Sequence, residues 1–343
     1  MSKISQRKDD HIRICLDEDP SFKLKTGGFE KYEFLHNALP ELNFDEIKIA
    51  GSFFGKNISA PFLISCMTGG FAEADNINEA LAEAAKELNI PIGVGSQRQL
   101  LENGAFESSF RIIKDKSGGV PVLGNIGGQQ LLSLQNISAV NRLVDVIEAD
   151  AMVVHLNPLQ ELIQRGGDTN FKGIAGKIKE LVACLEIPVI VKEVGSGIGK
   201  ETAEKLLELG VHGIDVAGAG GTSWSAVESL ANGNKVNPFW DWGLPTSYCV
   251  KEIAKLKSVS DFLLIGSGGI KNGIDIAKSI ALGADIAASA RPILLAYDKS
   301  GIEGVVNLLN AWFDDLKKVM LLTGSENLQS LRDKKLIKYS ELF

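Results

Sequence analysis

Polar residues with catalytic potential stand where short apolar runs end. His155 closes one such run, and Gln160 and Glu161 follow it closely. Glu161 is an oxygen ligand of the kind that Mg²⁺ uses, usually one or two carboxylates together with substrate phosphates. Gln160 and His155 can hydrogen-bond a substrate. Lys192 ends another run, and a lysine there needs a polar ligand or an internal partner such as Glu193. Both possibilities stay open for Lys192.

Three basic residues form a candidate anion site. Arg98 ends the second apolar run, whereas Arg7 and Lys8 lie near the N-terminus. Cations that converge on a diphosphate can each contribute roughly 1–4 kcal/mol, depending on exposure. Arginine can also hold two oxygens at once. The alternative for Arg7 and Lys8 is that they are simply solvated.

Small residues after the last two runs predict a phosphate site. Gly268 and Gly269 follow the seventh run, and Ser289 and Ala290 end the eighth. The usual phosphate site of a (β/α)8 barrel lies after strands 7 and 8. A helix beginning near Gly273 would add a favourable dipole. The alternative is that the glycines only close a turn.

The sequence predicts eight strand–helix units, which would position these residues. The apolar runs are β-branched-rich and apolar on both faces, which is typical of a buried parallel sheet. They cover residues 61–70, 90–98, 121–128, 151–158, 188–197, 213–224, 262–270 and 285–292. Helical patterns cover residues 76–88, 131–149, 171–185, 200–209, 248–257, 273–282 and 304–322. This rhythm predicts a closed α/β (β/α)8 TIM barrel. A doubly wound open sheet is the competing layout, but the densest glycine clusters follow the sixth and seventh runs, not the first.

The first apolar run begins at residue 61 and predicts the boundary between two parts of the chain. Residues 1–60 are expected to form an N-terminal extension that contributes substrate-binding residues, and residues 61–343 to form the barrel. Residues 225–247 show little periodicity and predict a long loop after strand 6. Side chains at other strand ends would together line the barrel mouth. They are Met67, Thr68, Ser96 and Asn125.

Composition excludes several classes of protein. The formal net charge of −7 argues against nucleic-acid binding, which needs a basic stripe. The four cysteines form no CxxC pair, so neither a zinc site nor a disulfide framework is predicted. No run has the length of a membrane span or of a signal peptide core. The sequence predicts a cytoplasmic protein without a membrane or nucleic-acid partner.

The motifs of this sequence resemble those of one family, the type 2 or FMN-dependent isopentenyl-diphosphate isomerases. RKDDH (7–11), HLNPLQE (155–161) and AGAGGTSW (217–224) form a specific combination. Further matches are MTGG (67–70), GSQR (95–98), NIGGQQL (125–131), VKEVGSGI (191–198) and GSGGI (266–270). GSGGI alone is shared by many barrels that bind phosphorylated ligands.

The resemblance implies an FMN-binding barrel that uses Mg²⁺ to interconvert isopentenyl and dimethylallyl diphosphate. It implies FMN contacts by Met67, Thr68, Gly69, Ser96, Asn125, Lys192, Thr222, Gly268, Gly269, Ser289 and Ala290. It implies substrate contacts by Arg7, Lys8, Ser96, Gln97, Arg98 and Gln160. Glu161 would bind Mg²⁺, NAD(P)H would only reduce the flavin, and the chain would form a homo-oligomer, a tetramer or an octamer.

The reaction is a 1,3 proton shift on an unactivated alkene, for which ordinary side-chain acids and bases are poorly matched. Reduced FMN as the acid and base would remove that mismatch, with His155 and Gln160 orienting the substrate. Trp224 would either wall the alkene or belong to the core.

The nearest rivals are an FMN oxidoreductase and a non-catalytic flavin- or phosphate-binding regulator. A 2-hydroxy-acid oxidase would need a histidine base late in the barrel, and no histidine follows the seventh run. A nucleotide-type dehydrogenase would need a cysteine in the loop after strand 6, and AGAGGTSW has none; Cys249 lies beyond it.

Overall fold

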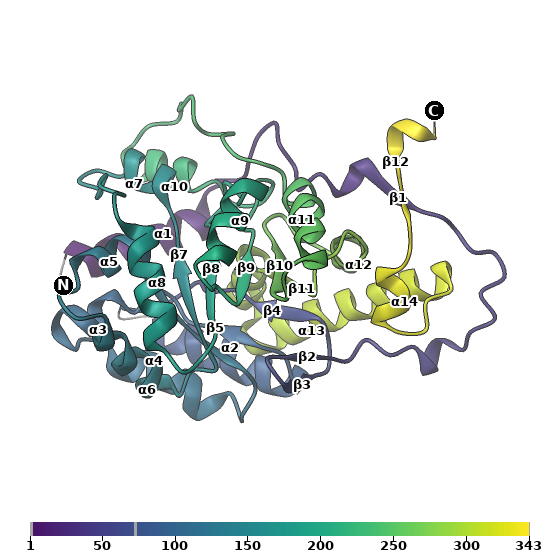
Figure 1. Ribbon diagram of the computed structural model, residues 1–343, viewed down its shortest axis with the longest axis horizontal. Helices are drawn as coiled ribbons and strands as arrows, with labels where there is room; N and C mark the ends of the chain where they lie inside the picture. Colours follow the sequence, from purple (N-terminus) through teal and green to yellow (C-terminus); the bar gives the residue numbers. More distant parts are fainter. Residues whose placement is uncertain (1–2, 72–73, 343) are drawn as a thin grey trace.

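A closed barrel forms the centre of the molecule (Figure 1). The computed structural model describes residues 3–71 and 74–342. Within them, eight parallel strands close into a ring in chain order. The strands are β4 (Phe62–Ile64), β5 (Ile92–Gly93), β6 (Val122–Gly127), β7 (Ala151–His155), β8 (Val189–Lys192), β9 (Gly213–Asp215), β10 (Leu263–Ser267) and β11 (Ile286–Ser289). The predicted (β/α)8 barrel is confirmed, and the doubly wound alternative is wrong because β11 pairs with β4.

Alternation along the strands divides the apolar core. Leu123, Val153 and Ile190 pack inside the barrel, whereas their neighbours along the chain pack against the outer helices. The hairpin formed by β2 (Gly51–Phe53) and β3 (Lys56–Ile58) adds Phe53 to the inner cluster. The barrel interior is therefore filled with side chains, and only its upper layer is available for chemistry.

The outer helices agree with the predicted ones, apart from one break. They are α2 (Ala74–Leu88), α8 (Ile174–Cys184), α9 (Lys200–Glu208), α11 (Thr246–Ala254) and α12 (Gly273–Ala281). The helix expected over residues 131–149 is instead α5 (Gly128–Ser133), the 3₁₀ turn η3 (Ile137–Val140) and α6 (Asn141–Ile147). The break arises because Asn136 is extended and its side chain accepts a hydrogen bond from the Ser138 N–H, which starts a new turn. Short helices also follow other strands: α3 (Arg98–Asn103), α4 (Glu107–Lys116) and α7 (Pro158–Ile163).

The segment 225–247 is not a loop throughout, contrary to the sequence prediction. Helix α10 (Trp224–Ala231) occupies its first residues. Ser223 caps this helix by accepting a hydrogen bond from the Ala226 N–H. Ser225, Ala226 and Val227 are buried, so tertiary packing stabilises a helix that is too short to show clear periodicity.

The two ends of the chain flank the barrel. Helix α1 (Lys3–Asp17) contacts α10 and α13 (Arg291–Thr323), which contains the helix expected over residues 304–322 and bends at Ser300 and Gly301. Beyond α14 (Leu328–Arg332), strand β12 (Leu336–Lys338) pairs with β1 (Tyr32–Phe34) to one side of the barrel (Figure 1). The remaining 3₁₀ turns are η1 (Phe29–Lys31), η2 (Phe44–Glu46), η4 (Lys255–Ser258) and η5 (Tyr339–Glu341).

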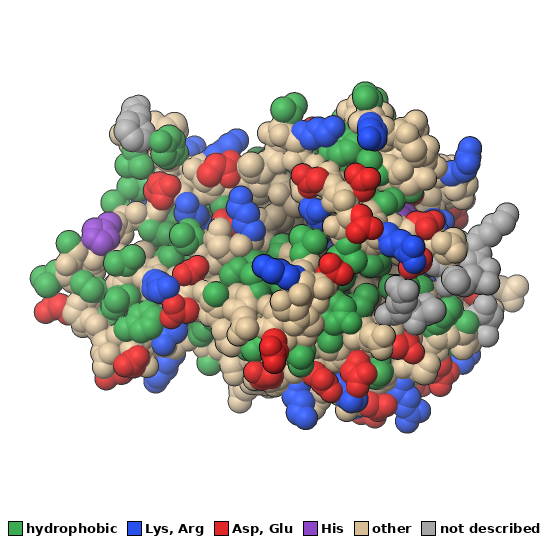
Figure 2. Space-filling model, turned by 180° about the vertical axis from the view of Figure 1, so that it is seen from behind, with side chains coloured by type: hydrophobic (Ala, Val, Ile, Leu, Met, Phe, Trp, Pro, Cys, Tyr) green, Lys and Arg blue, Asp and Glu red, His purple; other side chains and the backbone are tan. Residues whose placement is uncertain are grey.

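The surface mixes both signs of charge. Figure 2 shows basic and acidic side chains interspersed over one face of the molecule. Among the helices of residues 3–71 and 74–342, none is both long and apolar enough to cross a membrane.

Candidate active site at the barrel mouth

A cavity of about 420 Å³ opens where the barrel strands end. This volume lies in the usual range of ligand sites. Most of the residues proposed from the sequence line it, although they come from positions 7 to 290. They are Arg7, Lys8, Met67, Gly69, Ser96, Arg98, Asn125, His155, Gln160, Glu161, Lys192, Thr222, Trp224, Gly268, Gly269, Ser289 and Ala290. The fold therefore brings together the strand ends that the sequence singled out.

Two of the proposed side chains take other directions. Gln97 is fully buried, donates to the Leu143 carbonyl at 3.0 Å and accepts from the Asn125 N–H at 3.0 Å. Thr68 is also buried, and its hydroxyl bonds Asn78. Neither residue lines the cavity. Both instead fix the backbone of strand ends whose neighbours face it.

A row of charged and polar side chains crosses the inner face of the barrel mouth. The strand register aligns His155 with Lys192 and Lys192 with Asp215. These residues stand two positions after Val153, Ile190 and Gly213, so the period of two points them to the same face. Burial raises the pKa of Asp215, which the charge of Lys192 opposes. Lys192 donates to the backbone carbonyl of Glu193 at 2.7 Å and also lines the cavity. The Glu193 carboxylate itself accepts hydrogen bonds from the N–H groups of residues 194–196.

His155 is held in its neutral form. Burial, followed by the charges of Lys192 and Lys8, lowers the pKa of His155 to about 3. Its Nδ1 lies 2.8 Å from Asn125 Oδ1, and the Asn125 amide already donates to the Val94 carbonyl. Nδ1 therefore carries the proton, because an amide oxygen can only accept. This leaves Nε2 of His155 as a hydrogen-bond acceptor.

Helix α1 brings basic groups to the cavity. Lys8 Nζ donates to the carbonyls of Gly69 at 2.7 Å and of Ser96 at 2.9 Å. Burial, followed by the charges of Arg7 and Arg98, lowers the pKa of Lys8 to about 7. Arg98 forms an ion pair with Glu102 at 2.5 Å, with about a third of its side chain exposed. The three cations converge as expected, and an anion between them would relieve their mutual repulsion.

An oxygen-rich corner surrounds Glu161. Its carboxylate accepts hydrogen bonds from Asn157 at 3.1 Å, from Gln164 at 3.2 Å and from the Asp168 N–H at 2.8 Å. The buried Oδ1 of Asn157 has no hydrogen-bond partner. One carboxylate and amide oxygens fit Mg²⁺ only if substrate phosphates and water complete its shell. Among the described residues, no group of three histidine, cysteine or acidic side chains could bind a metal alone.

A buried carboxylate beside this corner was not predicted from the sequence as part of the site. Glu228 Oε1, on α10, accepts a hydrogen bond from Gln160 at 2.8 Å and lies 3.1 Å from His11 Nε2. His11 packs edge-on against Trp224 at 5.3 Å between ring centroids. Glu228 therefore fixes Gln160 and joins α1 to the wall of the cavity. The available signal was a Ser223 cap before an alanine- and valine-containing stretch, which predicts a helix instead of a loop.

The glycine turns after β9 and β10 pack backbone against backbone. A Cβ on Gly268 would lie 2.1 Å from the Gly218 carbonyl oxygen, and Gly268 and Gly269 have φ of +99° and +74°. Side chains are therefore excluded there, and N–H groups are left at the cavity edge. Ser289 and Ala290 follow on the neighbouring strand β11, where the long helix α13 begins. Open backbone and a helix N-terminus suit a phosphate.

The cysteines near this region are not nucleophiles. Burial raises the pKa of Cys66, which lines the cavity, to about 12. It raises the pKa of the buried Cys249 to about 12 as well. Both side chains are thiols at neutral pH, and only a thiolate attacks readily. This agrees with the argument against a cysteine-dependent dehydrogenase.

Sequence comparison decides the family. An isopentenyl-diphosphate delta-isomerase of Pelodictyon phaeoclathratiforme is 42% identical to this chain over 98% of each sequence. One from a Nostoc species is 43% identical over 96% of this chain and 95% of its own. The chain belongs to the isopentenyl-diphosphate delta-isomerase family. In addition, residues 137–338 match the family model described as FMN-dependent dehydrogenase. The resemblance noted from the motifs is thereby confirmed.

Similar solved structures confirm the barrel architecture. A flavocytochrome b2 with sulfite bound is 17% identical, with a TM-score of 0.70 over 96% of this chain and 82% of its own. A mandelate oxidase with (S)-mandelic acid is 16% identical, with a TM-score of 0.66 over 97% of this chain and 94% of its own. At these identities the likeness concerns the fold alone.

Proposed function

We propose that this chain interconverts isopentenyl and dimethylallyl diphosphate with the help of bound FMN and Mg²⁺. The observation that carries the proposal is the arrangement of one cavity. Glycines and small residues that could hold a phosphate edge the cavity at the ends of β10 and β11, and a group of basic side chains lines the same cavity from α1 and the end of β5. One cavity therefore offers separate places for two phosphorylated ligands, a cofactor and a substrate.

The cofactor would occupy the side formed by the barrel strands. Gly268, Gly269, Ser289 and Ala290 would hold the FMN phosphate, and Lys192 would face the electron-rich edge of the ring. The other proposed ring contacts are Met67, Gly69, Ser96, Asn125 and Thr222, with Thr68 acting through its backbone. Reduced FMN can supply a group that gives and takes a proton without net redox change, which suits an unactivated alkene.

The substrate diphosphate would lie against the cations. Arg7, Lys8 and Arg98 would meet its oxygens, and the Ser96 and Gln160 side chains would complete the polar wall. Glu161 would bind Mg²⁺ together with the diphosphate, because the protein alone offers too few ligands for the ion. Gln97 would act indirectly, by fixing the backbone beside Arg98.

The hydrocarbon part would lie beside His155, Gln160 and Trp224. Neutral His155 presents an acceptor and adds no charge, so it can orient a substrate without competing with Lys192 for negative charge. Gln160 is fixed by Glu228, which limits its rotation. The indole of Trp224, which lines the cavity, would form an apolar wall and exclude water from the allylic carbon. These residues would orient the alkene so that one carbon gains a proton while the other loses one.

The proposal also includes a reductant, an oligomeric state and a cellular location, none of which depends on the cavity residues. NAD(P)H would act only as a reductant of FMN. The homo-oligomer and the cytoplasmic location stay predictions from the sequence. Light scattering of the purified protein would measure the oligomeric state directly.

The deciding experiment uses purified protein, isopentenyl diphosphate, Mg²⁺, FMN and NADPH without oxygen. We expect dimethylallyl diphosphate to accumulate over many turnovers while NADPH is consumed only to reduce the flavin. Dithionite-reduced protein should be active without NADPH. Stoichiometric consumption of NADPH would indicate an oxidoreductase, and FMN binding without turnover would indicate a binding protein.

A further inference from the structure

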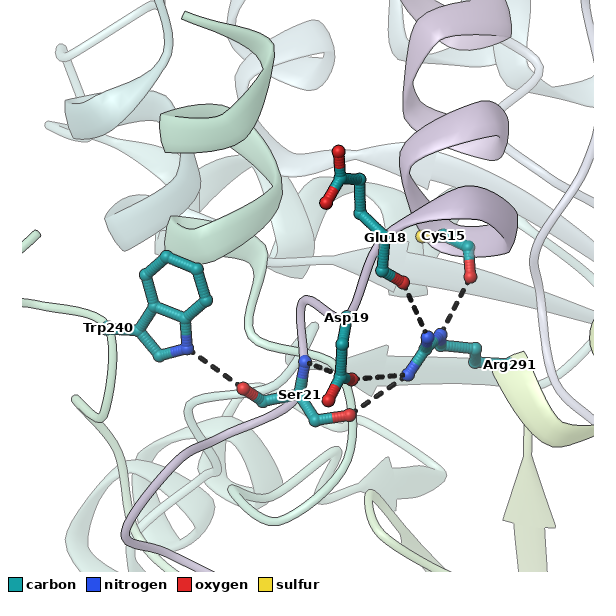
Figure 3. A network of polar contacts seen from close by, with 6 residues as sticks. All are labelled: Cys15, Glu18, Asp19, Ser21, Trp240 and Arg291. Atoms are coloured by element: carbon teal, nitrogen blue, oxygen red, sulfur yellow. Dashed lines mark hydrogen bonds and ion pairs between the residues drawn. The ribbon is translucent and has the colours of Figure 1, made fainter. Parts of the chain in front are cut away.

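Arg291 lies between the proposed phosphate site and the N-terminal segment. It is the first residue of α13, directly after β11, and it lines the cavity. A cation in this place would ordinarily be assigned to a bound phosphate. Its hydrogen bonds show a different use, because they all lead to residues 15–21 (Figure 3).

Four of the five N–H groups of the Arg291 guanidinium donate hydrogen bonds to other residues of this chain. Nε donates to the Cys15 carbonyl at 2.8 Å, and Nη2 donates to the Glu18 carbonyl at 2.9 Å. Nη1 donates to Ser21 Oγ at 2.9 Å and to Asp19 at 3.2 Å. Arginine has five such donors in a fixed fork. Arg291 is therefore engaged as a clamp and is not a free cation for a ligand.

The clamp acts on the C-terminal end of α1. The Cys15 carbonyl belongs to the last turn of that helix, whose carbonyls lack partners within the helix and carry its negative dipole end. A guanidinium there satisfies these carbonyls and stabilises the helix end. At a rise of about 1.5 Å per residue, Lys8 lies about 10 Å along the same helix. A change of tilt at the clamp would therefore displace Lys8 and Arg7 within the cavity.

Through Ser21 the clamp also reaches the loop between β9 and α10 and the segment after α10. The Ser21 carbonyl accepts from Trp240 Nε1 at 2.9 Å (Figure 3). Ser21 also pairs with Thr222 in an isolated β-bridge. Arg291 thus joins the end of β11, the end of α1 and the loop that carries Trp240. Of these segments, α1 carries Arg7 and Lys8, the residues proposed to meet the diphosphate.

We infer that Arg291 is a positioning residue for the diphosphate substrate, which acts by holding α1 so that Lys8 and Arg7 face the cavity. This inference rests on the proposed function. It predicts an effect on substrate affinity that depends on the fork of the guanidinium and on Ser21, not on positive charge alone. It also predicts that the flavin site, built by the barrel strands, is little affected.

The test compares Arg291→Ala, Arg291→Lys and Ser21→Ala with Arg142→Ala, a control at an exposed ion pair far along the chain. We expect KM for isopentenyl diphosphate to rise at least tenfold in Arg291→Ala and severalfold in Ser21→Ala, with kcat and the FMN dissociation constant changed less than threefold. Arg291→Lys should recover only part of the affinity. In the double variant, Ser21→Ala should add little to Arg291→Ala, because both break the same clamp.

Hydrogen exchange gives a readout that does not depend on turnover. Amides of α1 should exchange at least tenfold faster in Arg291→Ala, whereas those of α12 should be unchanged. Full recovery of KM by lysine, loss of FMN binding, or unchanged exchange in α1 would each overturn the inference. If wild-type protein lacks isomerase activity, the proposed function fails, but faster exchange in α1 would still establish the clamp. Should Arg291→Ala not fold, Ser21→Ala and Arg291→Lys carry the test.

Discussion

Lys8→Arg tests the proposed diphosphate site through its pH dependence. The pKa of Lys8 is lowered from 10.5 to about 7, first by burial and then by Arg7 and Arg98. Half of the free protein therefore carries a charged Lys8 at pH 7, and about 1% does at pH 9, by the ordinary titration curve. The pKa is lowered, so the charged form is lost as the pH rises. If diphosphate binding needs that charge, kcat/KM should fall about 50-fold between these pH values.

Arginine in place of Lys8 keeps its charge throughout this range. We expect Lys8→Arg to have a lower kcat/KM at pH 7, because a guanidinium replaces an ammonium group that donates to two carbonyls at 2.7 and 2.9 Å. Its kcat/KM should nevertheless stay level up to pH 9. The assay measures initial isomerase rates at low substrate concentration from pH 6.5 to 9.5, with FMN saturation checked at each pH. A decline of equal size in wild type and Lys8→Arg would refute the reasoning, as would a level profile in wild type.

Four further changes probe other parts of the site. Arg98→Ala should raise KM for the diphosphate at least tenfold and leave the flavin absorbance spectrum unchanged; an unchanged KM would remove Arg98 from the anion site. Glu161→Gln should raise the Mg²⁺ concentration needed for half-maximal rate at least tenfold, measured by Mg²⁺ titration. Glu228→Gln should lower kcat at least tenfold in steady-state assays, because both Gln160 and His11 contact Oε1 of Glu228, and a neutral amide oxygen is a weaker acceptor than a carboxylate oxygen. Finally, the pKa of His155 is lowered from 6.5 to about 3, so the unfolded chain binds the extra proton and stability falls as the pH drops below 6.5. Urea unfolding at pH 7 and 4.5 should show His155→Asn losing about 3 kcal/mol less than wild type, and equal losses would contradict a neutral buried histidine.

The sequence by itself determined the barrel and most of the cavity lining. Eight buried-type runs that alternate with helical stretches leave few layouts open, and parallel strands in a barrel all end at one rim. Residues such as Asn125, His155 and Lys192 could be placed at that rim by counting along each run. The period of two also explains why they share the inner face, although the sequence did not show which neighbours they would meet.

Side-chain direction near the rim was decided only by tertiary structure. Gln97 and Thr68 stand at strand ends like their neighbours, but the chain turns there and each side chain finds buried partners, Leu143 and Asn78. The reason is physical: strand alternation stops where the strand stops. Beyond that point, local backbone angles and available hydrogen-bond partners determine the direction.

Long-range partnerships were also outside the reach of the sequence. His11 meets Glu228 and Arg291 meets Cys15 because α1 folds across the barrel mouth and packs on α10 and α13. No local propensity specifies such contacts, since they depend on which apolar faces of separate helices fit together. The sequence therefore determined which residues were available for chemistry, whereas packing of the two ends of the chain decided the pKa of Lys8, the clamp at Arg291 and the carboxylate behind Gln160.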